Sequence, residues 1–204
     1  MNRSVDILIP TYNRGKFSKE IVDNINRQDY PFINRVIIAD DGDKEQKIDV
    51  SGCKYIVEYY NVNRMTIGAK RNFLMSRAKA YYVANMDTDD FYQDCYISTC
   101  IFNLIKFGKN ITGSADMICQ RGREKVLHRC VYLHLLNEAT IVCKRETYRK
   151  YADTSKGEGR EFLEGYENDI VETDINKIMI CLVHSENTID KSLLFVGVNP
   201  SHSP

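Results

Sequence analysis

The stretch Tyr81-Tyr82-Val83-Ala84-Asn85-Met86-Asp87-Thr88-Asp89-Asp90 joins a short apolar run to a cluster of acids. The apolar and aromatic first half is typical of a buried β-strand. Carboxylates at the end of such a strand are costly to bury unless a positive group lies between them. A hard divalent cation that carries a phosphate is the natural candidate. The stretch therefore indicates a metal site at a strand end and a phosphorylated ligand such as a nucleotide.

Strand and helix signals alternate around this stretch through the first half of the chain. Apolar runs predict strands at 5–10, 35–39, 55–60 and 81–85. Helical spacing of apolar residues predicts helices at 17–25, 66–78 and 97–105. Thr66 is expected to cap the second helix and Gly108 to end the third. This alternation with short links predicts an α/β fold with a single, mainly parallel central sheet flanked by helices.

The second half changes character. Apolar runs predict strands at 111–119, 126–133, 139–144 and 178–183. A basic turn joins the first two of these strands, and a short helix is expected to begin at Arg145. Residues 153–165 are polar and contain glycine, which is typical of a loop or of a loop with a helix. We therefore expect a smaller antiparallel β part beside the main sheet.

Composition narrows the class of protein. The 204 residues carry a formal net charge of zero, which argues against nucleic acid or an anionic membrane as a partner. No apolar run approaches the roughly 20 residues of a transmembrane segment, and we expect none. Seven cysteines without CxxC spacing favour neither a zinc site nor a disulfide framework. Free thiols indicate a reducing, cytoplasmic compartment.

Polar residues follow several of the predicted strands. In open α/β sheets, ligands bind at the carboxyl ends of the strands, so these residues should share one rim. They are Pro10, Thr11, Tyr12, Asn13, Asp40, Asp41, Asp87, Asp89, Asp90 and His184. Their coincidence on one rim carries more weight than any single motif.

The acidic cluster divides by role. Asp87 and Asp89 are two residues apart, so both can face the same side and chelate Mg²⁺ or Mn²⁺ beside a diphosphate. The alternative is a solvated acidic turn. Asp90 is expected to support the site or to cap the following helix. His184 is a candidate contact to the metal or phosphate, and its alternative is a structural or exposed histidine.

Other residues on the rim suit a nucleotide. Asp40 or Asp41 can accept a hydrogen bond from the ring of a base, and Tyr12 can stack on that base. Their alternatives are an ordinary β-turn and a half-buried aromatic residue. Arg71, near a helix start, suits a phosphate. The alternative for Arg71 is a solvated helix face, which is the preferred interpretation for the neighbouring Lys70.

The polar loop at 156–163 offers Glu158 and Glu161 as general bases. Glycines at 157 and 159 would let this loop close over a ligand. The alternative is an ordinary solvated loop.

Taken together, these motifs resemble those of glycosyltransferases with the GT-A fold, and of the large family 2 in particular. Four motifs carry the resemblance in the family's order and spacing: 7–14, 40–42, 67–72 and 85–90. Later, 157–163 resembles the loop that carries the catalytic base, and 184–188 resembles a motif on the metal or phosphate side. The chain is also similar to the amino-terminal transferase module of a large algal-virus protein, which implies a place in the host cytoplasm.

The resemblance implies a hexosyltransferase that moves a sugar from a nucleotide-sugar donor, most often a UDP-sugar, to a hydroxyl of a glycan or glycoprotein acceptor. It implies Mn²⁺ or Mg²⁺ as the cofactor. The implied nucleotide-binding residues are Pro10, Thr11, Tyr12, Arg14, Asp40, Asp41, Arg71 and Asp87. The implied metal ligands are Asp89, Asp87 and His184. We expect one domain over 1–198, with a nucleotide-binding half at 1–108, an acceptor and catalytic half at 109–198, and a tail or linker at 199–204 that can join the domain to a longer chain.

One departure from the family concerns the base. The family pattern has Glu-Asp in this loop, whereas Gly159 follows Glu158 here. This departure leaves the base open between Glu158, the first choice, and Glu161, the second. An inverting reaction with a glutamate base is expected, and a retaining reaction is the alternative. A domain that binds a nucleotide sugar without catalysis is the alternative. A metal-dependent phosphatase or a nucleotidyltransferase is less consistent, because each would need its signature after the first strand.

Overall fold

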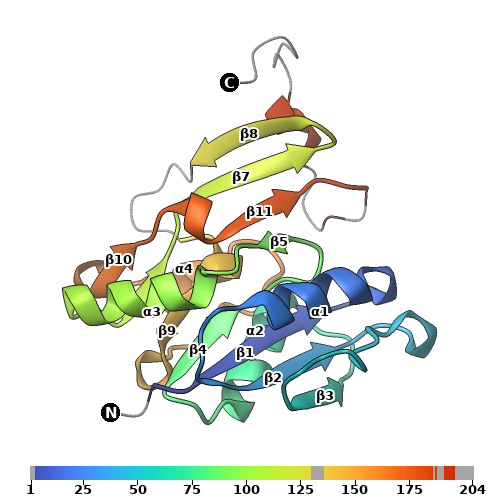
Figure 1. The fold of residues 1–204 in the computed structure, drawn as a ribbon, viewed down its shortest axis with the longest axis horizontal. Helices are drawn as coiled ribbons and strands as arrows, with labels where there is room; N and C mark the ends of the chain where they lie inside the picture. The colour runs from blue at the N-terminus through green and yellow to red at the C-terminus, as the bar shows by residue number, and fades with distance from the viewer. Residues whose placement is uncertain (1–2, 130–135, 186, 188–190, 196–204) are drawn as a thin grey trace.

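A computed structural model of the protein describes residues 3–129, 136–185, 187 and 191–195. Within this part, a seven-stranded central sheet has the order β10-β6-β9-β4-β1-β2-β3 (Figure 1). Its strands are β1 (Val5–Thr11), β2 (Ile33–Asp40), β3 (Val57–Asn61), β4 (Tyr82–Asn85), β6 (Ile111–Gly113), β9 (Val142–Lys144) and β10 (Ile170–Glu172). The four strands predicted in the first half all lie side by side in this sheet.

The direction of the strands brings the predicted rim together. β1 pairs in parallel with both β2 and β4, β2 with β3, and β6 with β10, whereas β9 runs antiparallel to both of its neighbours. Thr11 stands opposite Asp40 across the β1–β2 pair, and Leu8 stands opposite Asn85 across the β1–β4 pair. The strand ends that carry the polar residues therefore meet at one edge.

Helices cover both faces of the central sheet. The helix α1 (Ser18–Arg27) and the helix α3 (Tyr96–Phe107) pack on one face, and α2 (Ile67–Arg77) and α4 (Gly159–Leu163) pack on the other. Alternate residues of β1 divide between the two cores, with Ile7 and Ile9 under α1 and α3 and Leu8 under α2. Near-continuous apolar strands are what burial on both faces requires.

The helix ends follow the sequence predictions. Thr66 Oγ1 accepts a hydrogen bond from Ala69 N at 3.1 Å and caps α2. Gly108 ends α3 with a φ of 64°, which favours glycine. Short 3₁₀ helices lie at Gly15–Phe17, Lys44–Gln46, Glu138–Thr140, Arg145–Thr147, Glu167–Asp169, Ile175–Lys177 and Ser192–Phe195. The short helix expected from Arg145 is thus a single 3₁₀ turn.

A second, four-stranded sheet lies beside the first, at the top of Figure 1. Its order is β5 (Phe91–Tyr92), β11 (Met179–Leu182), β7 (Asp116–Arg121) and β8 (Glu124–Arg129). β5 with β11 and β7 with β8 are antiparallel pairs, and β11 with β7 is a parallel pair. The expected smaller β part is confirmed, and its centre is a parallel pair that the sequence did not predict.

Two strand predictions from the second half are wrong in detail. The predicted strand at 111–119 is two strands in different sheets, because buried Ser114 turns the chain: its N donates to Thr140 Oγ1 at 2.9 Å and its Oγ accepts from Asp116 N at 3.1 Å. The predicted strand at 139–144 starts late, since a 3₁₀ turn precedes β9. Residues 130–133 of another predicted strand and the tail at 199–204 lie outside the described residues.

Candidate active site

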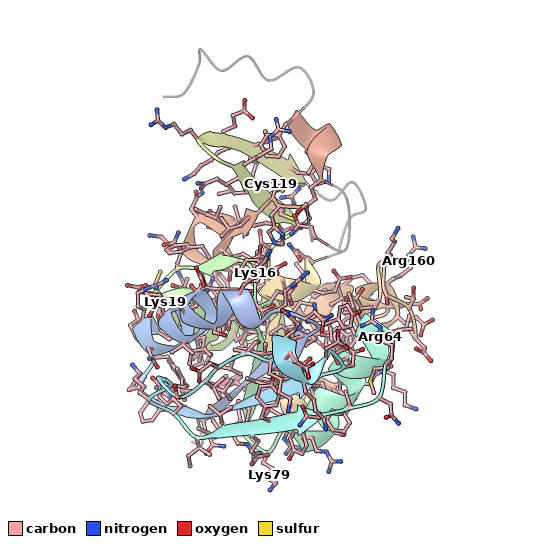
Figure 2. All side chains as sticks on the ribbon, turned by 90° about the vertical axis from the view of Figure 1, so that its right-hand side faces the viewer. Lys16, Lys19, Arg64, Lys79, Cys119 and Arg160 are labelled. Carbon is pink, nitrogen blue, oxygen red and sulfur yellow. The ribbon has the colours of Figure 1, made fainter. Side chains whose placement is uncertain are left out.

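A cleft of about 830 Å³ opens at the carboxyl edge of the parallel strands. Its walls are residues that follow β1, the acidic residues 87–90, residues of α2 and the loop at 155–160. Arg64 and Arg160 line this cleft and project from the same side of the molecule in Figure 2. Lys79, which precedes β4, lies at the opposite end of the molecule from Cys119 of the small sheet in Figure 2. The predicted rim is therefore a concave site.

The acidic cluster meets His184 at one wall of the cleft. Asp89 Oδ2 lies 3.1 Å from His184 Nε2 and 3.3 Å from Arg14 Nη2. His184 was expected on the rim of the main sheet, but it follows β11 of the small sheet. The two sheets therefore bring these residues together.

Asp90 joins the two sheets. It is buried, and its Oδ1 accepts a hydrogen bond from Leu182 N of β11 at 3.0 Å. The prediction that Asp90 caps the following helix is wrong, because α3 begins at Tyr96 with Cys95 in the cap position. The supporting role fits, since this bond ties β11 to the acidic cluster.

Arg71 links the acidic cluster to the loop at 155–160. It is buried, with Nη2 3.2 Å from Asp87 Oδ1 and Nε 3.1 Å from Glu158 Oε1. Burial lowers the pKa of Arg71, but the carboxylates of Asp87 and Glu158 outweigh that effect and raise the pKa overall. Within the described part of the chain, its buried Nη1 has no hydrogen-bond partner. A third donor at this position suits an anionic oxygen of a ligand.

Lys70 corrects a prediction. It was expected on a solvated helix face, yet it is 3% exposed and forms an ion pair with Asp41. Its Nζ also donates to Thr11 O at 2.7 Å. Asp41, whose side chain is fully buried, accepts in addition from Met65 N at 3.0 Å. A buried carboxylate needs a cation, and helix α2 supplies one from its first turn.

The expected base-binding residues lie at two depths. Pro10, Thr11 and Tyr12 line the cleft, and the Arg64 guanidinium stands 3.6 Å over the Tyr12 ring. Asp40 is buried and accepts from Gly42 N at 2.9 Å and Tyr59 Oη at 2.5 Å. Asp40 therefore shapes the turn after β2 from behind the cleft wall.

The two expected bases separate clearly. Glu158 is 5% exposed and lines the cleft, directly before α4. Glu161 is exposed on α4 and is not among the described residues that line the cleft. The geometry therefore brings only Glu158 to the site.

Sequence reasoning missed a third carboxylate, that of Glu138. It lines the cleft, and its Oε1 accepts a hydrogen bond from Gly159 N at 3.0 Å. Burial raises its pKa, and the negative charge of Glu158 adds to the effect. Glu138 has no acidic neighbour in the sequence and belongs to no spaced motif, so the sequence pattern did not identify it. The available signal was its place just before a strand in an α/β sheet.

The acidic residues fit a divalent cation only in company with a ligand. Among the described residues, no group of three or more His, Cys, Asp or Glu side chains could hold a metal ion. Asp89 and His184 are nevertheless close, and Asp87 is two residues away. When Mg²⁺ or Mn²⁺ is held jointly with substrate phosphates, the protein needs to supply only one or two ligands. The residues fit such a shared site.

The chain belongs to glycosyl transferase family 2, whose family model matches residues 6–165. It is similar to the glycosyltransferase GlyG of Streptococcus pneumoniae serotype 4, with 26% identity over 104 residues, 48% of this chain and 34% of that protein. The match thus spans about a third of the length of that relative.

Solved structures share the fold at low identity. The chain of S. aureus TarS 1–349 with UDP-GlcNAc superposes with a TM-score of 0.68 and 15% identity, over 89% of this chain and 59% of that one. The Pyrobaculum calidifontis mannosyltransferase PcManGT with GDP-Man and Mn²⁺ gives 0.66 and 14%, over 92% and 59%. Glucosyl-3-phosphoglycerate synthase of Mycobacterium tuberculosis, with Mn²⁺, UDP and glucosyl-3-phosphoglycerate, gives 0.60 and 17%, over 83% and 69%. These similarities confirm the expected GT-A fold.

Among the residues that the structure describes, no helix is long and apolar enough to cross a membrane.

Proposed function

We propose that this protein is a metal-dependent glycosyltransferase that moves a sugar from a nucleotide-sugar donor, a UDP-sugar by preference, to a hydroxyl of a glycan or glycoprotein acceptor. One observation carries the proposal: Arg71 lies between Asp87 of the acidic cluster and Glu158 of the loop. That contact joins the acidic cluster and the loop at 155–160 within one cleft. Nucleotides or nucleotide sugars in the similar solved structures support the donor class.

The donor nucleotide would bind along the end of β1. Pro10, Thr11 and Tyr12 would frame the base, with Tyr12 stacking on it once Arg64 moves from the ring face. Asp41 and Asp40 would act from behind the cleft wall, since both are buried. Arg14 and Arg71 would meet the phosphates, because both line the cleft as cations.

The metal side would be Asp87, Asp89 and His184. These residues would hold Mn²⁺ or Mg²⁺, which supplies neutralisation of the charge that develops on the leaving diphosphate. Asp90 would keep the cluster in place through its bond to Leu182. The fit rests on the closeness of Asp89 and His184, at 3.1 Å.

A carboxylate that lines the cleft would activate the acceptor hydroxyl. Glu158 is the better placed of the two expected bases, because it lines the cleft while Glu161 is exposed on α4. An inverting outcome would follow from direct attack of that hydroxyl on the sugar.

The second candidate function is binding of a nucleotide sugar without catalysis. The observation that favours it is Gly159, which stands where the family pattern has an acid. Turnover separates the two functions, since a binding domain would be stabilised by nucleotide and would release none from a donor.

The deciding experiment offers UDP-glucose, UDP-N-acetylglucosamine and GDP-mannose to the purified chain with Mn²⁺ and measures released nucleoside diphosphate. We expect Mn²⁺-dependent release from a UDP-sugar. Asp89→Asn should lower it at least about 100-fold, and Asp94→Asn, whose side chain is exposed in a surface ion pair with Arg27, should leave it unchanged. Release from none of the donors, with no nucleotide binding, would overturn the proposal.

A further inference from the structure

The carboxylate of Glu138 fills the space beside Gly159. A β-carbon built on Gly159 would lie 2.7 Å from both Cγ and Oε1 of Glu138 and 3.0 Å from its Cδ, so the Glu138 side chain would have to move to admit one. Gly159 N donates to that same Oε1 at 3.0 Å. Glu138 reaches this place from the 3₁₀ turn before β9, about 20 residues earlier in the chain. The glycine and the glutamate therefore form one complementary arrangement at the cleft.

The neighbouring carboxylate, that of Glu158, already forms an ion pair with Arg71. Its Oε1 lies 3.1 Å from Nε of the buried Arg71. A carboxylate oxygen that accepts a hydrogen bond from a buried guanidinium is held in that contact. Glu158 suits the task of holding Arg71 beside Asp87 better than the task of taking a proton.

Glu138 has the opposite surroundings. Burial and the nearby charge of Glu158 raise its pKa, and Arg71 lowers it by less. A general base works best when its pKa approaches the working pH, so an upward shift from the ordinary carboxyl range favours this role. Glu138 also lines the same cleft as Asp87 and Asp89.

We propose that Glu138 is the general base of the transfer reaction and that Glu158 is a positioning residue acting through Arg71. The assignment rests on the proposed function. The acceptor O–H gives its proton to the Glu138 carboxylate while the acceptor oxygen bonds to the anomeric carbon. The bond from that carbon to the diphosphate oxygen breaks, and the nucleoside diphosphate leaves with the electron pair.

The contact with Gly159 supplies a relocation test. In Glu138→Ala the space beside residue 159 is open, so Gly159→Asp in that background would place a carboxylate at almost the same position. Glu138→Ala with Gly159→Ala is the matched control, since it fills space without adding a charge. The readout is kcat and KM for release of nucleoside diphosphate from the donor, among UDP-glucose, UDP-N-acetylglucosamine and GDP-mannose, that the wild-type chain turns over.

We expect Glu138→Gln to lower kcat by about 10²–10⁴-fold, while KM for the donor and the thermal shift caused by UDP with Mn²⁺ stay at wild-type values. Glu138→Ala with Gly159→Asp should recover at least about tenfold over Glu138→Ala, and the alanine control should recover nothing. Glu158→Gln should change KM for the donor as well as kcat, because it releases Arg71.

Two results would overturn the assignment. Glu138→Gln could keep kcat within about threefold of wild type, or the relocated aspartate could recover no more than the alanine control. If the wild-type chain is active, either result overturns only the assignment of Glu138 as the general base. A wild-type chain that neither binds UDP nor releases it removes the proposed function, and the base assignment with it. If Glu138→Ala lowers the melting temperature too far to be assayed, Glu138→Gln alone decides the assignment, because glutamine preserves the packing beside Gly159.

Discussion

At the scale of single residues, buried charges organise the cleft. Lys70 neutralises Asp41 beneath the end of β1, and Arg71 serves both Asp87 and Glu158. Two consecutive residues of α2 thus pair with three carboxylates. Ions so far from water persist only when they are paired and hydrogen-bonded. The shape and the stability of this edge therefore depend on the same contacts.

Lys70→Met should destabilise the fold strongly. The change leaves the Asp41 carboxylate, whose side chain is fully buried, with Arg64 and Met65 N alone. Breaking a buried pair on one side costs about 3 kcal/mol or more, which urea denaturation measures as a loss in the free energy of unfolding. Lys19→Met, in an exposed pair with Asp23, is the control and should change nothing measurable. Equal effects of the two changes would contradict the role given to Lys70.

Glu138 gives the protein a pH dependence whose sign is fixed. Its pKa is raised on folding, so its contribution to stability is fully present below the unfolded value and is lost as pH rises through the folded value. Glu158, Arg71 and Tyr151 are the titratable groups that interact with it. Glu138→Gln cannot titrate. We therefore expect the free energy of unfolding of Glu138→Gln to rise relative to that of wild type as pH increases from about 4 to about 8.

Urea denaturation of both proteins across that range measures the difference. Glu161→Gln, on the exposed face of α4, should track wild type throughout. A Glu138→Gln curve parallel to wild type at every pH would contradict the raised pKa.

At the scale of elements, the first half of the chain could be read from its sequence because its signals are local. Apolar runs predicted β1, β2, β3 and β4. Thr66 caps the start of α2 and Gly108 ends α3, as expected. The second half depends on long-range pairing that no run of residues encodes. One apolar stretch divides between two sheets at Ser114, and β11 pairs with β7 across about 60 residues.

The same distinction applies to the site. Asp87, Asp89 and Arg71 lie where motif spacing predicts them, beside the cleft. Lys70 was misplaced because its burial depends on Asp41, a partner 29 residues away. Glu138 escaped notice because its contact with Gly159 exists only after folding. Sequence patterns predict the residues that a strand end delivers, whereas pairing between distant elements decides which of them face one another.

The cap of α2 makes a prediction at this scale. Thr66 Oγ1 accepts from Ala69 N and donates to Asp153 Oδ1 at 2.5 Å, so it joins the helix to the segment before Glu158. Thr66→Ala should cost about 1 kcal/mol and lower the melting temperature by about 2–4 °C for a chain of this size. Thr66→Ser keeps the hydroxyl and should stay near wild type. Equal losses in both variants would mean that the methyl group, and not the cap, stabilises α2.

At the scale of the whole molecule, the cleft lies between two sheets. Arg14 follows β1 and Asp89 follows β4 of the central sheet, and Arg71 lies on α2, which packs on that sheet. His184 lies in the segment after β11 of the small sheet and contacts Asp89. Asp90 holds the sheets together through Leu182 N. A ligand that contacts Asp89 and His184 together would add a further link between the sheets. Its binding should therefore stabilise the whole molecule against unfolding.

UDP with Mn²⁺ should therefore raise the melting temperature. At about 100 times the dissociation constant a ligand adds about 2.7 kcal/mol, which corresponds to about 5–10 °C for a domain of this size. Asp89→Ala should abolish the shift, because the cation loses the carboxylate that meets His184. Asp94→Ala, in an exposed pair with Arg27, should keep it. A melting curve that stays flat with UDP, GDP and dTDP alike would refute a nucleotide-sugar donor, and an undiminished shift in Asp89→Ala would refute the metal site alone.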